Sequence, residues 1–183
     1  MPRDRYPWWS QYTLVKRLRR LFQKPEVILS PYVRPGMVCA EIGCGMGFFT
    51  VPLAEMVGPE GRVYALDVEP KVLEEMVRRA ERAGVAERVR VLLCPAEELR
   101  IEEPADFALS VWSMHELDDL PLGVARIRDC LKPGAQFLMA EPKWHVSQAQ
   151  YEETVRAIAD GGFVQQGTPA VGVSRAAVFQ KAF

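Results

Sequence analysis

Three glycines at alternate positions, Gly43, Gly45 and Gly47, lie in the stretch EIGCGMGFFT, directly after the apolar run MVCA. Glycine has no Cβ and adopts positive φ readily, so this spacing predicts a loop whose backbone can approach a bound ligand closely. A helix after the loop would point its N-terminal amide groups at the same ligand. A tight strand-to-helix turn that binds nothing would also explain the three glycines.

Two acidic residues belong to the same pattern. Asp67 ends the apolar run RVYALDV, where a carboxylate can accept hydrogen bonds from both ribose hydroxyls of an adenosine; a helix cap before Pro70 is the alternative. Glu41 lies two residues before the glycine loop and suits a cationic ligand better than a pyrophosphate. Because position 48 is Phe, the glycines do not follow the GxGxxG spacing of nicotinamide-binding proteins.

The chain has two histidines, His115 in SVWSMHEL and His145 in EPKWHVS, and each follows a predicted strand. Free histidine has a pKa of about 6.5 and can accept a proton near neutral pH. Glu141 ends the strand before His145, where it can orient either ring. The alternatives are a structural hydrogen-bond donor for His115, a helix-preceding cap for His145 and a solvated carboxylate for Glu141. No HxxxH or HxH spacing is present, so no metal site is predicted.

Hydrophobic periodicity alternates between strand and helix patterns, which is typical of a parallel sheet with crossover helices. Helices are expected from the apolar spacing that begins at Val72, at Leu120 and after Ser147, which forms a capping-box pattern with Gln150. Asp118 and Asp119 before Pro121, and the stop signals Lys132-Pro133-Gly134 and Gly161-Gly162, mark helix ends. The expected strands are 37–42, 62–68, 88–94, 106–112, 135–141, 163–167 and 173–182.

The predicted elements divide the chain into two regions. Residues 1–35 are expected to form a helical extension, with a helix over 12–22 and a shorter turn near 25–29, and residues 36–183 to form the sheet domain. The extension concentrates the aromatic residues Trp8, Trp9, Tyr12 and Phe22. It is interpreted either as a lid that closes over a bound ligand or as a helix that covers the edge of the sheet.

The composition restricts the function classes. With a formal net charge of −1 and no block of like charges, the sequence does not favour nucleic-acid binding. Its four cysteines are scattered without CxxC spacing, which is typical of reduced thiols in a cytosol. No signal peptide and no apolar stretch of about 20 residues is present, so a cytoplasmic protein that does not bind membranes is expected. The sequence makes no prediction of the oligomeric state.

Five motifs occur in order: EIGCGMG, ALDVEP, CPAEEL, ADFALSVWSMHEL and LKPGAQFLMAEP. In sequence and spacing they resemble the class I S-adenosylmethionine-dependent methyltransferases, in particular small prokaryotic members of the ubiquinone/menaquinone or "type 11" kind. The resemblance runs from about Gly36 to the C-terminus. It implies an α/β fold with a single doubly wound, Rossmann-like, seven-stranded sheet, mostly parallel and with an antiparallel last strand.

The resemblance also implies roles for particular residues. The methionine part of the cofactor would lie against Gly43, Gly45, Gly47, Glu41 and Trp112; Asp67 would bind the ribose; Val68, Ala96 and Glu97 would border the adenine. Pro95 stands where many relatives have Asp and has no amide hydrogen, so the backbone N–H of Ala96 is the expected adenine donor.

The expected function is methyl transfer from S-adenosylmethionine to a small-molecule acceptor by in-line displacement, with His115, His145 and Glu141 as candidate catalytic residues. Holding donor and acceptor collinear is itself a large part of such catalysis, and a base is needed when the acceptor must lose a proton. The alternatives are a non-catalytic module that binds S-adenosylmethionine, a nucleic-acid methyltransferase and a nicotinamide-dependent oxidoreductase. SVWSMHEL lacks the Asn/Asp-Pro-Pro-aromatic element typical of nucleic-acid amino methyltransferases.

Overall fold

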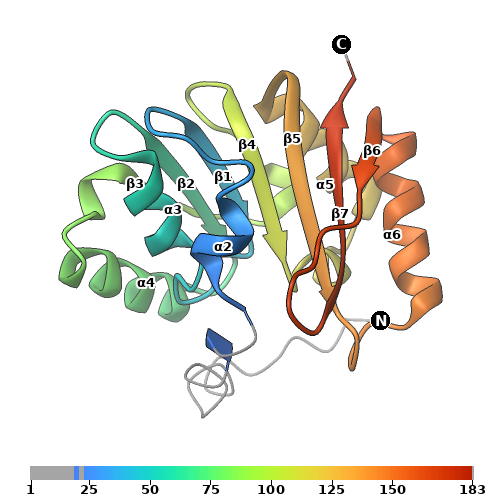
Figure 1. Ribbon diagram of the computed structural model, residues 1–183, viewed down its shortest axis with the longest axis horizontal. Helices are drawn as coiled ribbons and strands as arrows, with labels where there is room; N and C mark the ends of the chain where they lie inside the picture. The colour runs from blue at the N-terminus through green and yellow to red at the C-terminus, as the bar shows by residue number, and fades with distance from the viewer. Residues whose placement is uncertain (1–18, 21–22, 183) are drawn as a thin grey trace.

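The structure is a computed structural model that describes residues 19–20 and 23–182 (Figure 1). Its strands are β1 (Val38–Ile42), β2 (Arg62–Asp67), β3 (Val89–Leu93), β4 (Ala105–Val111), β5 (Leu131–Pro142), β6 (Phe163–Gly167) and β7 (Ser174–Lys181). Its helices are α2 (Pro25–Leu29), α3 (Thr50–Val57), α4 (Pro70–Arg82), α5 (Leu120–Cys130) and α6 (Gln148–Asp160), with short 3₁₀ turns η2 (Ala86–Arg88), η3 (Ala96–Glu98) and η4 (Met114–Glu116).

The strands of the described region form one seven-stranded sheet in the order β3-β2-β1-β4-β5-β7-β6. β1 pairs in parallel with both β2 and β4, whereas β7 runs antiparallel to β5 and β6. Figure 1 shows β4 and β7 pointing to opposite edges of the sheet. The predicted fold class is confirmed, including the antiparallel last strand. Strand order reverses between β1 and β4, and such a switch point is where doubly wound sheets bind ligands.

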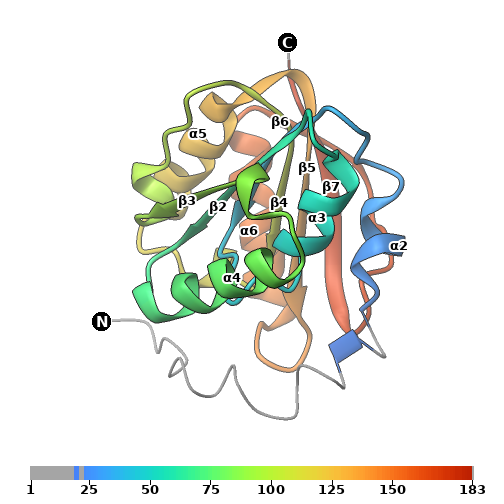
Figure 2. The same cartoon turned by 90° about the vertical axis from the view of Figure 1, so that its left-hand side faces the viewer.

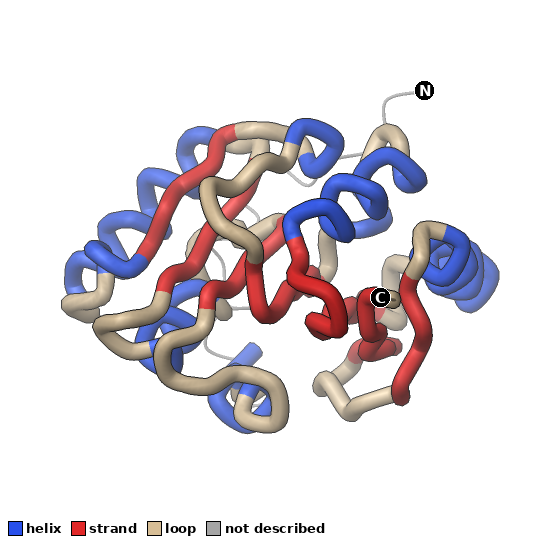
Figure 3. The backbone as a smooth tube through the Cα atoms, turned by 90° about the horizontal axis from the view of Figure 1, so that it is seen from above, coloured by secondary structure: helices blue, strands red, loops and turns tan. Residues whose placement is uncertain are grey.

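Helices cover both faces of the sheet, as the views in Figures 2 and 3 show. Successive residues of β1 face opposite sides: Ala40 belongs to one buried apolar cluster and Cys39 to the other. One cluster contains α5 and α6 side chains, and the second contains side chains of α2, α3 and α4. This two-layer burial holds the strand ends in a rigid arrangement, and the loops that follow them therefore have fixed positions.

Several helix boundaries follow the predicted signals. The Asp119 side chain accepts the backbone N–H of Leu122 at 3.0 Å and caps α5, which has Pro in its first turn. Ser147 and Gln150 form the predicted capping box at the start of α6. These local hydrogen bonds satisfy amide groups that have no partner inside the helix.

The fifth strand differs from its prediction. It begins at Leu131, which pairs with Ala105, and not at residue 135; the register then shifts before Gln136 pairs with Phe107. Pro133 has no amide hydrogen and Gly134 has a φ of 75°, so the chain bulges there and then resumes its pairing. The predicted stop signal therefore ends α5 but lies inside β5.

The structure describes only part of the predicted N-terminal extension. The shorter turn expected near 25–29 is the five-residue helix α2, whose Leu29 is fully buried. The helix expected over 12–22, and with it the aromatic residues of the proposed lid, lies outside the described residues except for Arg19 and Arg20. In the described part of the chain, no helix has the length and apolarity needed to cross a bilayer.

Candidate functional site

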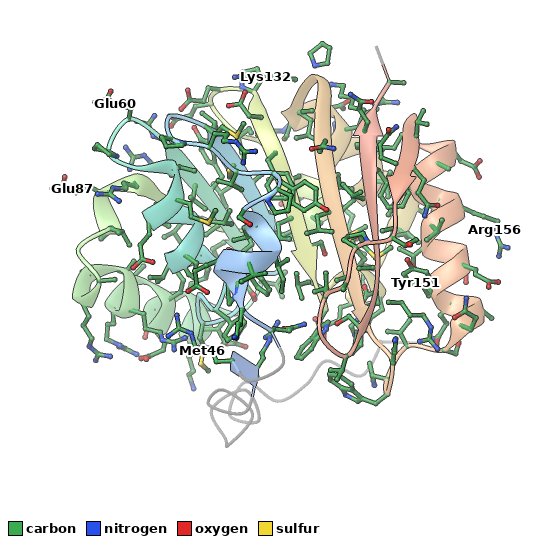
Figure 4. All side chains as sticks on the ribbon, in the orientation of Figure 1. Met46, Glu60, Glu87, Lys132, Tyr151 and Arg156 are labelled. Atoms are coloured by element: carbon green, nitrogen blue, oxygen red, sulfur yellow. The ribbon has the colours of Figure 1, made fainter. Side chains whose placement is uncertain are left out.

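A cleft lies at the carboxyl ends of β1, β2 and β4, next to the switch point of the sheet. Its empty volume, including the open mouth, is about 460 Å³, within the range of small-molecule sites. Figure 4 places Met46, from the glycine loop, at this lower edge and Lys132 at the opposite edge. The cleft is lined by Ile42, Gly43, Leu66, Asp67, Val68, Pro95, Ala96, Glu97, Ser113, Glu116, Leu117 and Asp118.

The glycine loop lies at this edge of the sheet, and its Gly43 lines the cleft. Gly43, Gly45 and Gly47 all have positive φ, of 72°, 51° and 78°, a conformation that L side chains rarely adopt. A Cβ on Gly43 would lie 2.3 Å from the Cβ of Ser113, in the loop after β4. Glycine at position 43 is therefore required by the chain's own packing, which is what the tight-turn explanation states.

Asp67 connects the glycine loop to the end of β2. Its Oδ2 accepts the backbone N–H of Gly45 at 2.8 Å, and its Oδ1 accepts the backbone N–H of Glu69 at 3.0 Å. Burial raises the pKa of Asp67, while these backbone hydrogen bonds act in the opposite direction. The helix cap of α4 is Glu69, which accepts the backbone N–H of Lys71 at 3.3 Å. Asp67 therefore faces the cleft as a fixed acceptor, as a ribose ligand requires.

Glu41 lies beneath the glycine loop and does not line the cleft. It is 3% exposed, and the Thr50 hydroxyl donates to its Oε2 at 2.6 Å. Burial raises the pKa of Glu41 to about 8; the Thr50 hydrogen bond and the charge of Arg19 partly counteract this shift. Near neutral pH this carboxyl group is therefore largely protonated, and its contact with a cationic ligand stays a prediction.

Replacing Glu41 by Gln is expected to raise the melting temperature at pH 9 by at least about 4 °C and to change it little at pH 5. The folded protein retains a proton on Glu41 that the unfolded chain releases between about pH 4.5 and 8, so this residue lowers stability as pH rises through that window. Glutamine is neutral throughout and keeps an oxygen that can accept the Thr50 hydroxyl. Calorimetric melts of both proteins at pH 5, 7 and 9 measure the effect; a shift of equal size at every pH would contradict it.

The part of the cleft next to η3 combines apolar and polar residues. Val68, Pro95 and Ala96 form the apolar wall. The Glu97 side chain accepts the backbone N–H of Asp119 at 2.9 Å, and so holds the start of α5 against η3. A cleft that combines the Asp67 carboxylate, apolar lining residues and Gly43, which has no Cβ, fits the adenosine part of S-adenosylmethionine.

The predicted catalytic residues come together at the ends of β4 and β5. The Glu141 carboxylate, 1% exposed, accepts the backbone N–H of His115 at 3.1 Å and lies 2.7 Å from its Nδ1. Glu116 Oε1 lies 4.0 Å from the other ring nitrogen, Nε2. The rings of His115 and His145 meet edge to face with centroids 5.0 Å apart, and His145 is exposed. Among the described residues, no group of three or more His, Cys, Asp or Glu is arranged to hold a metal ion.

Trp112 lies beside the cleft and not in its lining. It has a φ of 69°, the one positive φ among the described residues other than glycine, and its Nε1 donates to the Ser174 hydroxyl at 2.8 Å. Trp144 contacts it edge to face at 4.8 Å and is 59% exposed. A backbone conformation of this kind costs on the order of 1–3 kcal/mol and persists where packing enforces it. The strained bend turns the indole toward Ser174 and toward the guanidinium of Arg19.

Gly43, Asp67, Val68, Ala96 and Glu97 are the predicted site residues that line the cleft. Gly45 and Gly47 belong to the glycine loop, while Glu41 and Trp112 are not part of the lining. Arg19 and Gln23 are not among the site residues predicted from the sequence; Gln23 is 1% exposed. The N-terminal region contains several basic residues, and their type and spacing do not show which of them is buried.

Comparisons with known proteins identify the family of this chain. Residues 40–134, just over half of the chain, match the methyltransferase domain family. The demethylmenaquinone methyltransferase of Symbiobacterium thermophilum is 27% identical over 117 residues, which are 63% of this chain and 47% of that protein. The 2-phytyl-1,4-naphtoquinone methyltransferase of Trichormus variabilis is 28% identical over 56% of this chain and 45% of that protein. The matched region therefore spans less than half the length of these curated relatives.

A similar fold occurs in a solved structure. The S-adenosylmethionine-dependent methyltransferase from Aquifex aeolicus superposes with a TM-score of 0.83 over 96% of this chain and 99% of its own, at 22% identity. The resemblance first drawn from the five motifs is thereby confirmed. On these matches and on its sheet topology, the chain belongs to the methyltransferase domain family and has the fold of the class I S-adenosylmethionine-dependent methyltransferases.

Proposed function

We propose that this protein transfers a methyl group from S-adenosylmethionine to a small-molecule acceptor that loses a proton in the reaction. The observation that carries the proposal is the pair formed by His115 and Glu141, whose Nδ1 and Oε2 atoms are 2.7 Å apart next to the cleft. His115 belongs to the 3₁₀ turn η4, and Glu116 of the same turn lines the cleft. A base and a nucleotide site therefore adjoin each other.

Binding of the cofactor would use three parts of the cleft. Asp67 would accept the ribose hydroxyls, Val68 and Ala96 would contact the adenine, and the backbone at Gly43 would lie against the amino-acid chain. When bound, S-adenosylmethionine would supply a methyl group on a positively charged sulfur: an acceptor in line with the carbon–sulfur bond would bond to the methyl carbon as S-adenosylhomocysteine leaves with the electron pair of the broken bond. The rigid ends of β1, β2 and β4 hold these groups, and fixed orientation is the main source of rate enhancement in such a transfer.

The His115 ring would accept the acceptor's proton at Nε2. A buried carboxylate from Glu141 favours the tautomer in which Nδ1 carries the hydrogen, because the two Glu141 oxygens accept from the backbone N–H and from Nδ1–H of His115. The lone pair then lies on Nε2. The same carboxylate would stabilise the imidazolium after proton transfer, as an orienting acid does beside a catalytic histidine. His145, exposed and in contact with the His115 ring, would border the acceptor.

The residues around His115 and Glu141 favour a small, planar acceptor. Trp144 exposes more than half of its side chain beside Trp112, and together they offer an apolar surface for a ring. The net charge of −1 does not favour a polyanionic partner. The curated relatives named above methylate naphthoquinone-type compounds by their names, which supports an acceptor with an acidic ring carbon or hydroxyl.

Two measurements on the full chain test the proposal. Calorimetry with S-adenosylhomocysteine, S-adenosylmethionine and NAD is expected to give binding of the two sulfur nucleosides and none of NAD. Transfer of a radiolabelled methyl group is then measured over a panel of quinols, phenols and amines, with transfer RNA as the nucleic-acid member. Transfer to no member of the panel, despite tight S-adenosylhomocysteine binding, would favour a non-catalytic binding module. Transfer to the RNA alone would overturn the small-molecule proposal.

A further inference from the structure

Arg19 is held between aromatic rings at the far end of the glycine loop. Its guanidinium carbon, Cζ, lies 3.8 Å from the centroid of the Trp112 ring and 4.4 Å from that of Phe48. Trp112 follows β4, and Phe48 follows Gly47, so these rings belong to the two loops that border the switch point. The described stretch 19–20 lies beneath the carboxyl ends of the parallel strands in Figure 1. A sequence-distant cation is therefore positioned at the edge of the sheet where the cleft opens.

A hydrogen-bonded frame fixes this guanidinium. Arg19 Nε donates to Gln23 Oε1 at 2.7 Å, and Gln23 Nε2 donates to the Ser174 hydroxyl at 3.3 Å. Ser174 also accepts from Trp112 Nε1, so the cation and one wall of its aromatic slot share an anchor. A frame of this kind, which includes the nearly fully buried Gln23, orients the guanidinium plane before any ligand binds.

The donors of Arg19 are only partly used. Within residues 19–20 and 23–182, its side-chain hydrogen bond is the one from Nε to Gln23, whereas a guanidinium carries five N–H donors. No ion pair of Arg19 within 4.0 Å is present in this part of the chain. The two terminal nitrogens, Nη1 and Nη2, therefore offer the forked arrangement that binds a carboxylate with two parallel hydrogen bonds.

The local charge balance also favours an anion. Burial lowers the pKa of Arg19 to about 10, and the nearby Glu41 acts in the opposite direction. Glu41 has a pKa of about 8 because it is buried, so near neutral pH it compensates the guanidinium only in part. A positive charge removed from water is strongly stabilised by an anionic partner. Aromatic faces stabilise the cation but leave its edge available.

From this geometry we infer that Arg19 binds the α-carboxylate of the amino-acid portion of S-adenosylmethionine. The inference rests on the proposed function. Asp67, Val68 and Ala96 lie at the adenosine end of the cleft, and Gly43 and Ser113 lie at the end toward β4. The amino-acid chain would run from the ribose past Gly43 toward the loop after β4, whose Trp112 contacts the Arg19 guanidinium. A residue that precedes the sheet domain in sequence thus completes the cofactor site.

The test compares two ligands that differ in the amino-acid portion. S-adenosylhomocysteine carries the carboxylate, whereas 5′-methylthioadenosine has the same adenosine and thioether without it. Arg19→Met keeps an apolar side chain between the rings and removes the charge. Arg20→Ala is the matched control, because Arg20 is exposed and pairs with Glu26 at 2.9 Å on the surface. Titration calorimetry gives all affinities, and melting temperatures show that each variant is folded.

Arg19→Met is expected to weaken S-adenosylhomocysteine binding at least about tenfold, the effect of one charge-assisted pair, and to leave 5′-methylthioadenosine binding unchanged. Arg20→Ala should change neither affinity. Equal losses for both ligands would overturn the inference and leave Arg19 a structural role. Tighter S-adenosylhomocysteine binding by Arg19→Met would also overturn it, because the guanidinium would then occupy the ligand's own place. If the wild type bound neither ligand, the proposed function itself would fail.

Discussion

Replacing His115 by Ala is expected to lower methyl transfer about 10²–10³-fold, the usual contribution of a general base, and to leave cofactor affinity within about twofold of the wild type. The side chain contacts Glu141 and His145 and does not line the adenosine cleft, so its loss removes proton transfer without removing cofactor contacts. Turnover is measured with the acceptor found in the panel, and affinity by titration with S-adenosylhomocysteine. Equal losses in turnover and in affinity would contradict a role in proton transfer.

Glu141→Gln sharpens this prediction because it leaves the His115 ring in place. A glutamine can accept the backbone N–H of His115, as Oε1 of Glu141 does at 3.1 Å, but its amide nitrogen donates where Oε2 accepted. The ring then takes the tautomer with hydrogen on Nε2 and loses its basic nitrogen on that side. Turnover should fall nearly as far as in His115→Ala, with a changed pH profile. A fully active Glu141→Gln enzyme would show that the carboxylate does not position the base.

Replacing Asp67 by Ala is expected to weaken S-adenosylhomocysteine binding by about 100-fold, which corresponds to two hydrogen bonds of roughly 1.5 kcal/mol each. The carboxylate lines the cleft and is held in place by the backbone N–H groups of Gly45 and Glu69. Its removal deletes the proposed ribose acceptor and also releases the amide of Gly45 from its partner. Calorimetric titration measures the affinity, and thermal melts measure the accompanying loss of stability.

Asp106→Ala is the matched control for this change. Asp106 also accepts a backbone N–H, that of Val38 at 2.9 Å, and it pairs with Lys132 at 2.6 Å. These contacts lie at the start of β4, on the edge of the sheet opposite the cleft, where Figure 4 labels Lys132. Stability should fall in both variants, and affinity should fall only in Asp67→Ala. A comparable loss of affinity in Asp106→Ala would mean that general destabilisation, and not ribose binding, explains the Asp67 result.

The secondary structure was largely predictable because its signals are local. Alternating apolar residues, Pro in the first turn of α4 and α5, and the Ser147–Gln150 capping box each act over a few residues of chain. The exception is the start of β5, where Leu131 pairs with Ala105 before the bulge at Pro133. That pairing depends on a partner strand 26 positions earlier in the chain, and no local pattern marks it.

The candidate site likewise combines features that the sequence predicts with features that only the tertiary structure shows. The sequence by itself determined the glycine loop, the position of Asp67 at the end of a strand and the convergence of His115, His145 and Glu141, because strand-end positions in a parallel sheet converge at one edge. Only the tertiary structure decided that Glu41 is buried against Thr50 and that Arg19 lies between Trp112 and Phe48. Burial and charge pairing depend on which segments pack over a residue, and those segments are distant in the sequence, so residue type and spacing could not reveal them.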